Sequence, residues 1–240
     1  MPEAMGMQAV SLAFWGYFGA CAVAGARRRP GRAGRMLCAL LALSMAVTCA
    51  CVIQSGQSLV QTLLPLHLCS LCALLAAAFY LHPTRGVYHF LWYLGMPGAA
   101  LALLFPSVLQ VPWQAPLEAA FFSTHALIVL SPLWHAAGGT LPAPAAAPRA
   151  LAQCNLFAAF VYAVDRLLGV NYLFLLAAPP GTPLAFFESL GRIPYLLSLE
   201  AAAALCVGAM ALAARGLARR PGTWYNPLAR DSDPSGNAVR

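Results

Sequence analysis

The chain of 240 residues contains no lysine and few charged residues of any kind. Only 9% of its residues are charged, whereas soluble domains usually carry about 25%. This shortage of charge excludes an ordinary soluble domain, and a hydrophobic content of 61% excludes a disordered chain. Alternating polar and apolar segments of about ten residues, which are typical of membrane β-barrels, are also missing. The sequence therefore predicts an all-α, polytopic membrane protein.

Long apolar runs are what the sequence has instead. A hydrocarbon core of roughly 30 Å is crossed by about 20 helical residues. Seven runs approach or exceed this length, and they predict one transmembrane helix bundle over residues 1–220: 8–26, 36–53, 63–81, 87–105, 117–136, 151–176 and 193–214. Residues 221–240 are polar and predict a disordered tail. Gly95 and Pro97 predict a kink or a close helix contact in the fourth run.

All fourteen basic residues are arginine, and their placement predicts the orientation of the chain. If seven helices cross the membrane, twelve of them fall on one side: Arg27, Arg28, Arg29, Arg32, Arg35, Arg85, Arg149, Arg215, Arg219, Arg220, Arg230 and Arg240. Basic loops face the cytoplasm, so the N-terminus is predicted outside and the C-terminus in the cytoplasm. Short basic loops also indicate no nucleic-acid partner. The Pro-rich residues 138–148 predict a flexible or polyproline-like cytoplasmic linker.

Polar side chains at membrane depth form the candidate site, because such groups are costly in lipid and commonly mark function. Those that fall in the outer half of the predicted spans are His67, His125, Asp165, Arg166, Asn171 and Glu200. Their shared depth predicts a pocket that opens toward the outer leaflet. A structural alternative stays open, in which Glu200 pairs with Arg166 and each histidine bonds a backbone carbonyl.

The eight cysteines lie within or beside apolar runs, so most are interpreted as small buried residues. Cys69 and Cys72 alone supply too few ligands for a metal site, and neither a metal nor a cofactor is expected. In a regular helix, His67 would point roughly 140–200° away from both cysteines. The expected base for a thiol is therefore His125, on another predicted helix.

Several short motifs resemble the YwaF-like family of bacterial integral membrane proteins. They are Leu64-Pro65-Leu66-His67-Leu68-Cys69-Ser70, Ser123-Thr124-His125, Asn171-Tyr172-Leu173-Phe174-Leu175, and Pro194-Tyr195 followed by Leu197-Ser198-Leu199-Glu200. Together they cover the chain from about residue 40 to residue 214, in the order of the family. That family is similar, at a distance, to the eukaryotic transmembrane protein 164 group. In that group, a His-x-Cys element of a membrane helix is associated with thiol-dependent acyl transfer between phospholipids.

The resemblance implies a multi-pass protein of the bacterial plasma membrane whose partners are membrane lipids. It implies that Cys69 is the acyl-accepting thiol, with His125 and His67 as supporting imidazoles. The residues expected to bind the substrate are Asp165, Arg166, Asn171, Tyr172 and Glu200. Whether the chain is an enzyme stays open at this point. The same polar residues would also suit a transporter or channel, or a scaffold in which they hold helices together.

Overall fold

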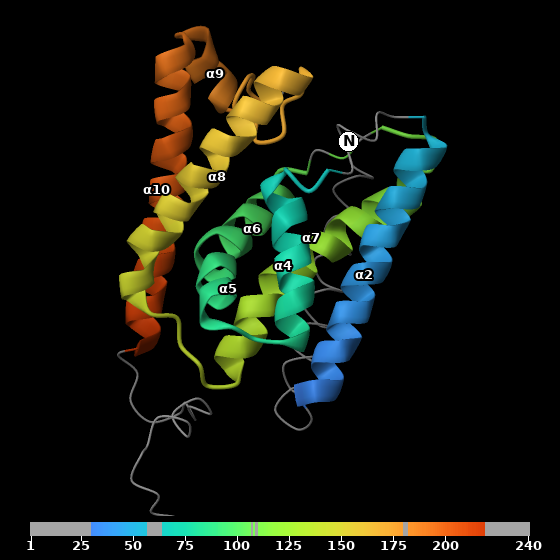
Figure 1. Cartoon of the computed structure of the whole chain (residues 1–240), viewed down its shortest axis with the longest axis vertical. Coiled ribbons are helices and arrows are strands. Elements are labelled where there is room, and N and C mark those ends of the chain that lie inside the picture. The colour runs from blue at the N-terminus through green and yellow to red at the C-terminus, as the bar shows by residue number, and fades with distance from the viewer. Residues whose placement is uncertain (1–29, 57–63, 107, 109, 180–181, 219–240) are drawn as a thin grey trace, which may run out of the picture.

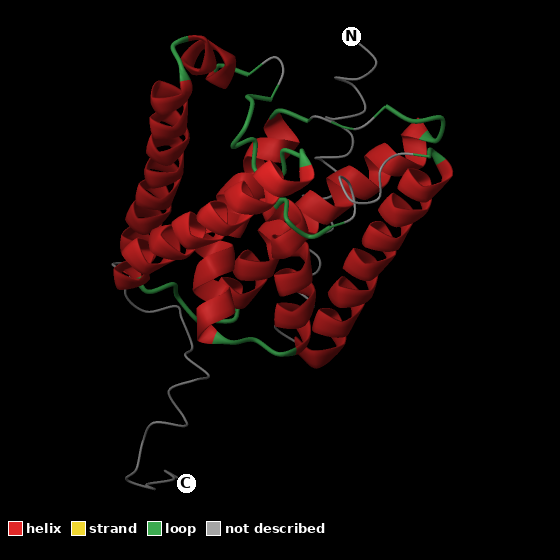
Figure 2. Cartoon of the chain, turned by 45° about the horizontal axis from the view of Figure 1, so that its top comes forward, coloured by secondary structure: helices red, strands yellow, loops and turns green. Residues whose placement is uncertain are grey.

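The computed structural model of the chain describes residues 30–56, 64–106, 108, 110–179 and 182–218. Within these ranges the chain forms helices and connecting loops and no strand (Figure 2). The predicted all-α class is therefore confirmed. The first predicted span, residues 8–26, and the predicted tail, residues 221–240, lie outside the described residues.

Helical elements follow one another along the described chain (Figure 1). They are α2 (Pro30–Gln54), α4 (Leu68–Leu81), α5 (Arg85–Phe90), the π-helix η1 (Leu91–Gly95), α6 (Met96–Leu104), α7 (Gln114–Ala137), the 3₁₀ turn η2 (Pro144–Ala146), α8 (Ala147–Leu168), α9 (Leu184–Ser189) and α10 (Arg192–Ala218). Among the described residues, five helical stretches are long and apolar enough to cross a membrane: Gly31–Gln54, Arg85–Leu104, Gln114–Ala137, Pro144–Leu168 and Arg192–Ala218.

Helix α4 is shorter than the predicted span over residues 63–81. It has 14 residues, a length of roughly 21 Å at 1.5 Å per residue. The chain at Pro65 is still in a turn, and His67 is extended, with φ −67° and ψ 138°. Proline lacks the N–H that a helix interior needs, so the helix starts only after this turn. The described residues therefore contain five candidate spans, and the count of seven stays a prediction, because residues 8–26 lie outside the described part.

Helix α8 also differs from its prediction, which covered residues 151–176. It begins at Ala147 and ends at Leu168, and Gly169 follows with φ 66°. This left-handed conformation favours glycine and is a common helix terminator. The carbonyl of Asp165 accepts hydrogen bonds from the N–H groups of Gly169 and Val170, which closes the last turn. The predicted end at residue 176 is wrong, and the residues that follow form a loop.

The stretch Arg85–Leu104 carries the feature predicted from Gly95 and Pro97. Five residues, Leu91–Gly95, form a π-helical turn just before Pro97, where the missing N–H interrupts the regular ladder. A Cβ atom placed on Gly95 would lie 3.2 Å from the Cys72 sulfur and 3.5 Å from the Ile128 side chain. The predicted close helix contact is therefore confirmed, and it joins this stretch to α4 and α7.

The core lies between α2, α4, α7 and the stretch Arg85–Leu104. Its largest fully buried apolar side chains include Leu37, Leu41, Phe79, Leu91, Leu127 and Ile128. Helices α8 and α10 lie together on the opposite side of the molecule from α2, and both contact η1 (Figure 1). Both helices expose large apolar side chains, with Leu156 and Leu205 each 75% exposed. Such a surface is suited to lipid.

The ends of the long helices gather at two opposite ends of the bundle (Figure 1). At one end α2, α5 and α8 begin and α10 stops, and five arginines lie in these terminal turns or beside them: Arg32, Arg35, Arg85, Arg149 and Arg215. We call this the arginine end. At the other end α4, α7 and α10 begin and α8 stops. We call it the His67 end.

The Pro-rich segment 138–148 is held in place by side chains of the preceding helices. The hydroxyl of Tyr88 donates to the carbonyl of Thr140, and that of Tyr93 donates to the carbonyl of Ala143, both at 2.8 Å. The N–H of Ala143 donates to His89 Nε2 at 3.2 Å. Of the two predicted forms, the flexible linker is wrong, because buried tyrosine hydroxyls need acceptors and take them from this segment.

Candidate functional site

His67 and Cys69 lie at the start of α4, at the His67 end of the bundle. His67 is the residue that precedes the first helical residue, and its carbonyl accepts the N–H of Leu71 at 3.0 Å. Because His67 is extended, the argument that a regular helix turns it away from Cys69 does not apply. That argument assumed that residue 67 is helical, whereas α4 begins only at Leu68.

Cys69 is the second residue of α4, and it is half-buried with a free thiol. The backbone N–H groups of Leu68, Cys69 and Ser70 have no hydrogen-bond partner among the described residues. Unpaired N–H groups make the start of a helix electropositive, so they attract negative charge on a bound group. Cys72 is fully buried and packs against Gly95, so of the two cysteines Cys69 is the more accessible.

Asp165 lies in the last turn of α8, close to the residues that precede α4. Its side chain is 0% exposed, and Oδ1 accepts the N–H of Tyr172 at 3.0 Å. Oδ2 is buried and has no hydrogen-bond partner among the described residues. The carboxylate lies near enough to His67 to interact with it electrostatically. Figure 1 shows the upper end of α8 approaching the start of α4.

Tyr172 completes this cluster from the loop that follows α8. Its ring meets the His67 imidazole edge to face, with 5.1 Å between the ring centroids. Val161, Val170 and Leu66 pack around it. Burial raises the pKa of the Tyr172 phenol, and the neighbouring Asp165 carboxylate raises it further. Asp165, His67 and Tyr172, all predicted as site residues, are therefore brought together from distant parts of the sequence.

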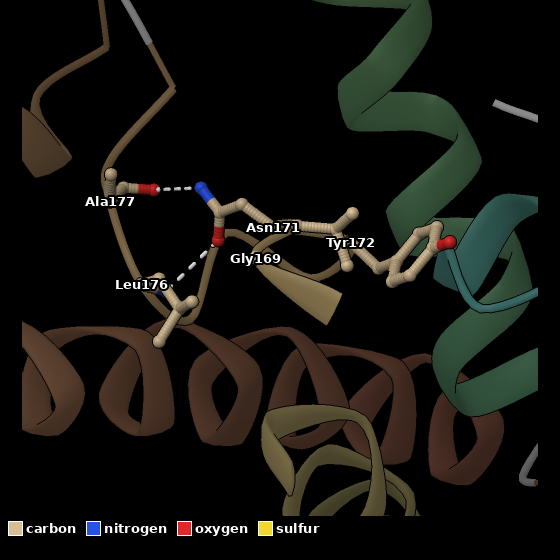
Figure 3. Close-up of a pocket in the computed structure, with 6 residues that line it drawn as sticks. Gly169, Asn171, Tyr172, Leu176 and Ala177 are labelled. Carbon is tan, nitrogen blue, oxygen red and sulfur yellow. Dashed lines mark hydrogen bonds between the residues drawn. The ribbon is translucent and has the colours of Figure 1, made fainter. Parts of the chain in front are cut away.

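An open pocket of about 490 Å³ lies beside the cluster, lined by Gly169, Val170, Asn171, Tyr172, Leu176 and Ala177. The amide of Asn171 holds its wall: Oδ1 accepts the N–H of Leu176, and Nδ2 donates to the carbonyl of Ala177, both at 2.9 Å. Figure 3 shows these bonds and the Tyr172 ring, which points away from Asn171 toward the teal segment leading into α4. Asn171 thus lies at the pocket and shapes it.

The same loop is anchored by α10. Arg192 donates to the carbonyl of Leu176 at 2.9 Å, and its guanidinium lies over the Tyr162 ring of α8, 5.6 Å from the centroid. The hydroxyl of Tyr195 donates to the carbonyl of Phe174. Phe174 has φ 56°, a left-handed conformation that costs a non-glycine residue roughly 1–2 kcal/mol. The anchors from α10 therefore hold a strained loop in one shape.

His125 lies in the middle of α7, a helix that packs against α4. It is 7% exposed, and its Nδ1 lies 2.8 Å from the carbonyl oxygen of Phe121. A carbonyl only accepts, so Nδ1 carries the proton and Nε2 is left as the potential base. The ring of Phe121 covers it at 4.2 Å between centroids. No hydrogen bond or ring contact among the described residues joins His125 to Cys69.

Glu200 and Arg166 do not pair. Oε1 of Glu200 accepts from Asn155 Nδ2 at 3.0 Å, which links α10 to α8. Arg166 lies eleven residues further along α8, roughly 16 Å away at 1.5 Å per residue, and is exposed at the His67 end. The structure therefore places Glu200 apart from the cluster around His67.

One contact of the site was missed by the sequence reasoning. Phe121 supplies both the carbonyl and the ring that hold His125. Its spacing of four residues from His125 places the two on one helix face, and that spacing was the available signal.

Comparison with known proteins gives one relationship. A family model described as TMEM164 family matches residues 4–212, which is most of the chain. Searches of curated proteins and of solved structures found no match. The predicted similarity to the transmembrane protein 164 group is therefore confirmed, whereas the bacterial YwaF-like assignment stays a prediction.

Proposed function

The chain belongs to the TMEM164 family, and from that premise we propose that it transfers acyl chains between membrane phospholipids through Cys69. The observation that carries the proposal is the position of the Cys69 thiol. It is half-buried in the first turn of an apolar helix, beside unpaired N–H groups and two residues after His67. A half-buried thiol in this position can be reached by a lipid ester, and the N–H groups beside it favour negative charge.

The reaction proceeds in two halves. In the first, the Cys69 thiolate attacks the ester carbonyl of a phospholipid, a C–S bond forms, and the ester C–O bond breaks. The leaving lysophospholipid oxygen takes a proton, and the enzyme keeps a thioester. In the second, the hydroxyl of another lysophospholipid attacks the thioester, so that a C–O bond forms and the C–S bond breaks. No oxidant, reductant or cofactor enters this balance.

The groups around the thiol suit this chemistry. A thiol in an apolar environment needs a base, and His125 offers Nε2 for that role because Nδ1 is bonded to Phe121. The unpaired N–H groups of α4 would stabilise the oxyanion that develops on the carbonyl oxygen. Both contributions use fixed parts of the bundle rather than a mobile element.

The proposed site faces the outer leaflet. The arginine end carries five arginines, whereas Arg166 and Arg192 lie at the His67 end. Because basic residues favour the cytoplasmic side, we assign the arginine end to the cytoplasm. The pocket beside Tyr172 then opens toward the outer surface of a plasma membrane, where phospholipid glycerol groups lie.

A non-enzymatic scaffold is the second candidate. It is favoured by the hydrogen bonds of His125 to Phe121 and of Glu200 to Asn155, since both satisfy polar groups within the bundle. In that function His125 only holds its own helix. The two candidate functions therefore differ in whether removing the imidazole of His125 slows acyl transfer.

The proposal is tested by His125→Leu in purified protein reconstituted in vesicles. The vesicles contain a phospholipid with a deuterated acyl chain and an unlabelled lysophospholipid, without coenzyme A. The wild type is expected to form deuterated product, and His125→Leu is expected to form it about 10²–10⁴-fold more slowly, as for loss of a general base. The measurement is the initial rate by mass spectrometry.

His82→Leu is the matched control, because His82 caps the opposite end of α4 and is exposed. It is expected to retain the wild-type rate. A folded wild-type protein that forms no deuterated product would refute acyl transfer and favour the scaffold.

A further inference from the structure

The two histidines of the proposed site have different surroundings. His67 precedes α4 at the His67 end, is half-buried, and packs against Tyr172, which lines the open pocket. His125 lies within α7, is buried, and is covered by the Phe121 ring. Acyl transfer moves a proton from a thiol in one half-reaction and from a hydroxyl in the other. Two imidazoles in different surroundings are suited to a division of these tasks.

Asp165 is the feature that the proposed chemistry has not used. A fully buried carboxylate oxygen without a donor is unusual, because leaving a buried polar group unpaired costs roughly 1–3 kcal/mol. The other oxygen is held by the N–H of Tyr172, which fixes the carboxylate in place. Oδ2 is thus an oriented acceptor that lacks a donor among the described residues.

His67 is the donor that its surroundings provide. It interacts electrostatically with Asp165, and the Tyr172 ring packs against its imidazole. The side chain makes no capping hydrogen bond to α4, so no bond to that helix holds its ring nitrogens. The two groups are not hydrogen-bonded in the structure, and rotation of the His67 ring is what would pair them. Catalytic hydrogen bonds commonly tighten only when substrate is bound.

We propose that Asp165 positions His67 as the base for the acceptor hydroxyl, an inference that rests on the acyl transfer proposed above. Asp165 Oδ2 accepts one ring N–H of His67, which leaves the other ring nitrogen to take the hydroxyl proton. The hydroxyl oxygen forms the new C–O bond, the C–S bond of the Cys69 thioester breaks, and the sulfur recovers the proton from His67. Asp165 stabilises the transient imidazolium and stays ionised throughout.

The location supports this assignment. The hydroxyl of a lysophospholipid belongs to its glycerol group, which lies at the membrane interface rather than in the hydrocarbon core. His67 packs against Tyr172, one of the residues that line the open pocket, whereas His125 is buried within the helices. Of the two histidines, His67 is therefore the one linked to this end of the bundle by a contact.

The test separates the two half-reactions in Asp165→Asn. The asparagine keeps an oxygen for the Tyr172 N–H, so a structural role of Asp165 would survive, but its NH₂ group cannot accept from His67. Reconstituted protein is loaded with a labelled phospholipid, the thioester is measured, and lysophospholipid is then added to release it. The variant is expected to form the thioester at the wild-type rate and to release it at least about tenfold more slowly.

Two further variants keep the test decisive. Glu118→Gln is the matched control at the same end of the bundle, where Glu118 Oε1 accepts from Gln114. It is expected to release the thioester as the wild type does. His67→Gln is expected to show the same arrest as Asp165→Asn, and it decides the matter if Asp165→Asn fails to fold.

Normal release in Asp165→Asn, or equal slowing of both half-reactions, would overturn the positioning role and leave the proposed function standing. Absence of any thioester in the wild type would instead overturn the proposed function itself. The two failures are therefore distinguished in one experiment.

Discussion

Replacing Cys69 by alanine is expected to abolish acyl transfer while the bundle stays folded. The change removes the sulfur that forms the proposed thioester. Loss of a nucleophile lowers turnover by factors of up to about 10⁶, so at least about a 10³-fold fall is expected. The readout is the rate at which deuterated acyl chains appear on lysophospholipid.

The fold should tolerate this change, because Cys69 is half-buried, its thiol is free, and alanine favours a helix. Cys206→Ala is the matched control, since Cys206 is also half-buried and lies on α10. It should transfer acyl chains at the wild-type rate. Retained transfer in Cys69→Ala, with loss in Cys72→Ala, would show that the wrong cysteine was chosen.

The largest effect on stability is expected at Gly34, in the second turn of α2. A Cβ atom there would collide with the backbone carbonyl of Tyr80 in α4 and would lie 3.4 Å from the Trp134 ring. Backbone cannot move aside as a side chain does, so α2 and α4 would have to separate. Gly34→Ala is expected to lower the free energy of unfolding by about 1–3 kcal/mol.

Gly208→Ala on α10 provides the matched control, because a Cβ there meets nothing within 4 Å. Removing a glycine from a helix interior without contact should raise stability by about 0.5–1 kcal/mol. The measurement is the thermal unfolding midpoint of both variants in detergent. A Gly34→Ala protein as stable as the wild type would mean that α2 does not approach α4 as closely as described.

Hydropathy predicted the long helices well because lipid demands apolar side chains along the whole crossing. Hydropathy could not place the ends of these helices, because a helix can extend beyond the membrane through residues that are not apolar. The run at 36–53 belongs to α2, which begins at Pro30 and includes Arg32 and Arg35. The run at 193–214 likewise extends to Ala218 in α10.

The ends that affect the site had local signals that apolar content outweighed. Leu173, Leu175 and Leu176 made residues 151–176 resemble one long span, yet Gly169 ends α8 in a left-handed turn. Pro65 likewise prevents α4 from beginning earlier, so His67 lies outside the helix. Residues that form turns therefore determine where α8 ends and where α4 begins. A count of apolar residues does not detect them.

Depth along the helices predicted part of the candidate site. It grouped His67 with Asp165, which the structure brings to one cluster around Tyr172, and with Glu200, which lies apart from it. Which faces of two helices meet depends on how each is rotated in the bundle, and the sequence of one helix does not contain that angle. The bond of Asn155 to Glu200 could be found only from the packed structure.

The central claim is that Cys69 carries the acyl chain, and the mass of the peptide containing Cys69 tests it most directly. Wild-type protein is incubated with a phospholipid bearing a deuterated acyl chain, quenched in acid and digested. The account predicts one deuterated acyl group on Cys69, which neutral hydroxylamine removes as a thioester. Unmodified Cys69 in protein that transfers acyl chains, or acylation at another residue only, would contradict it.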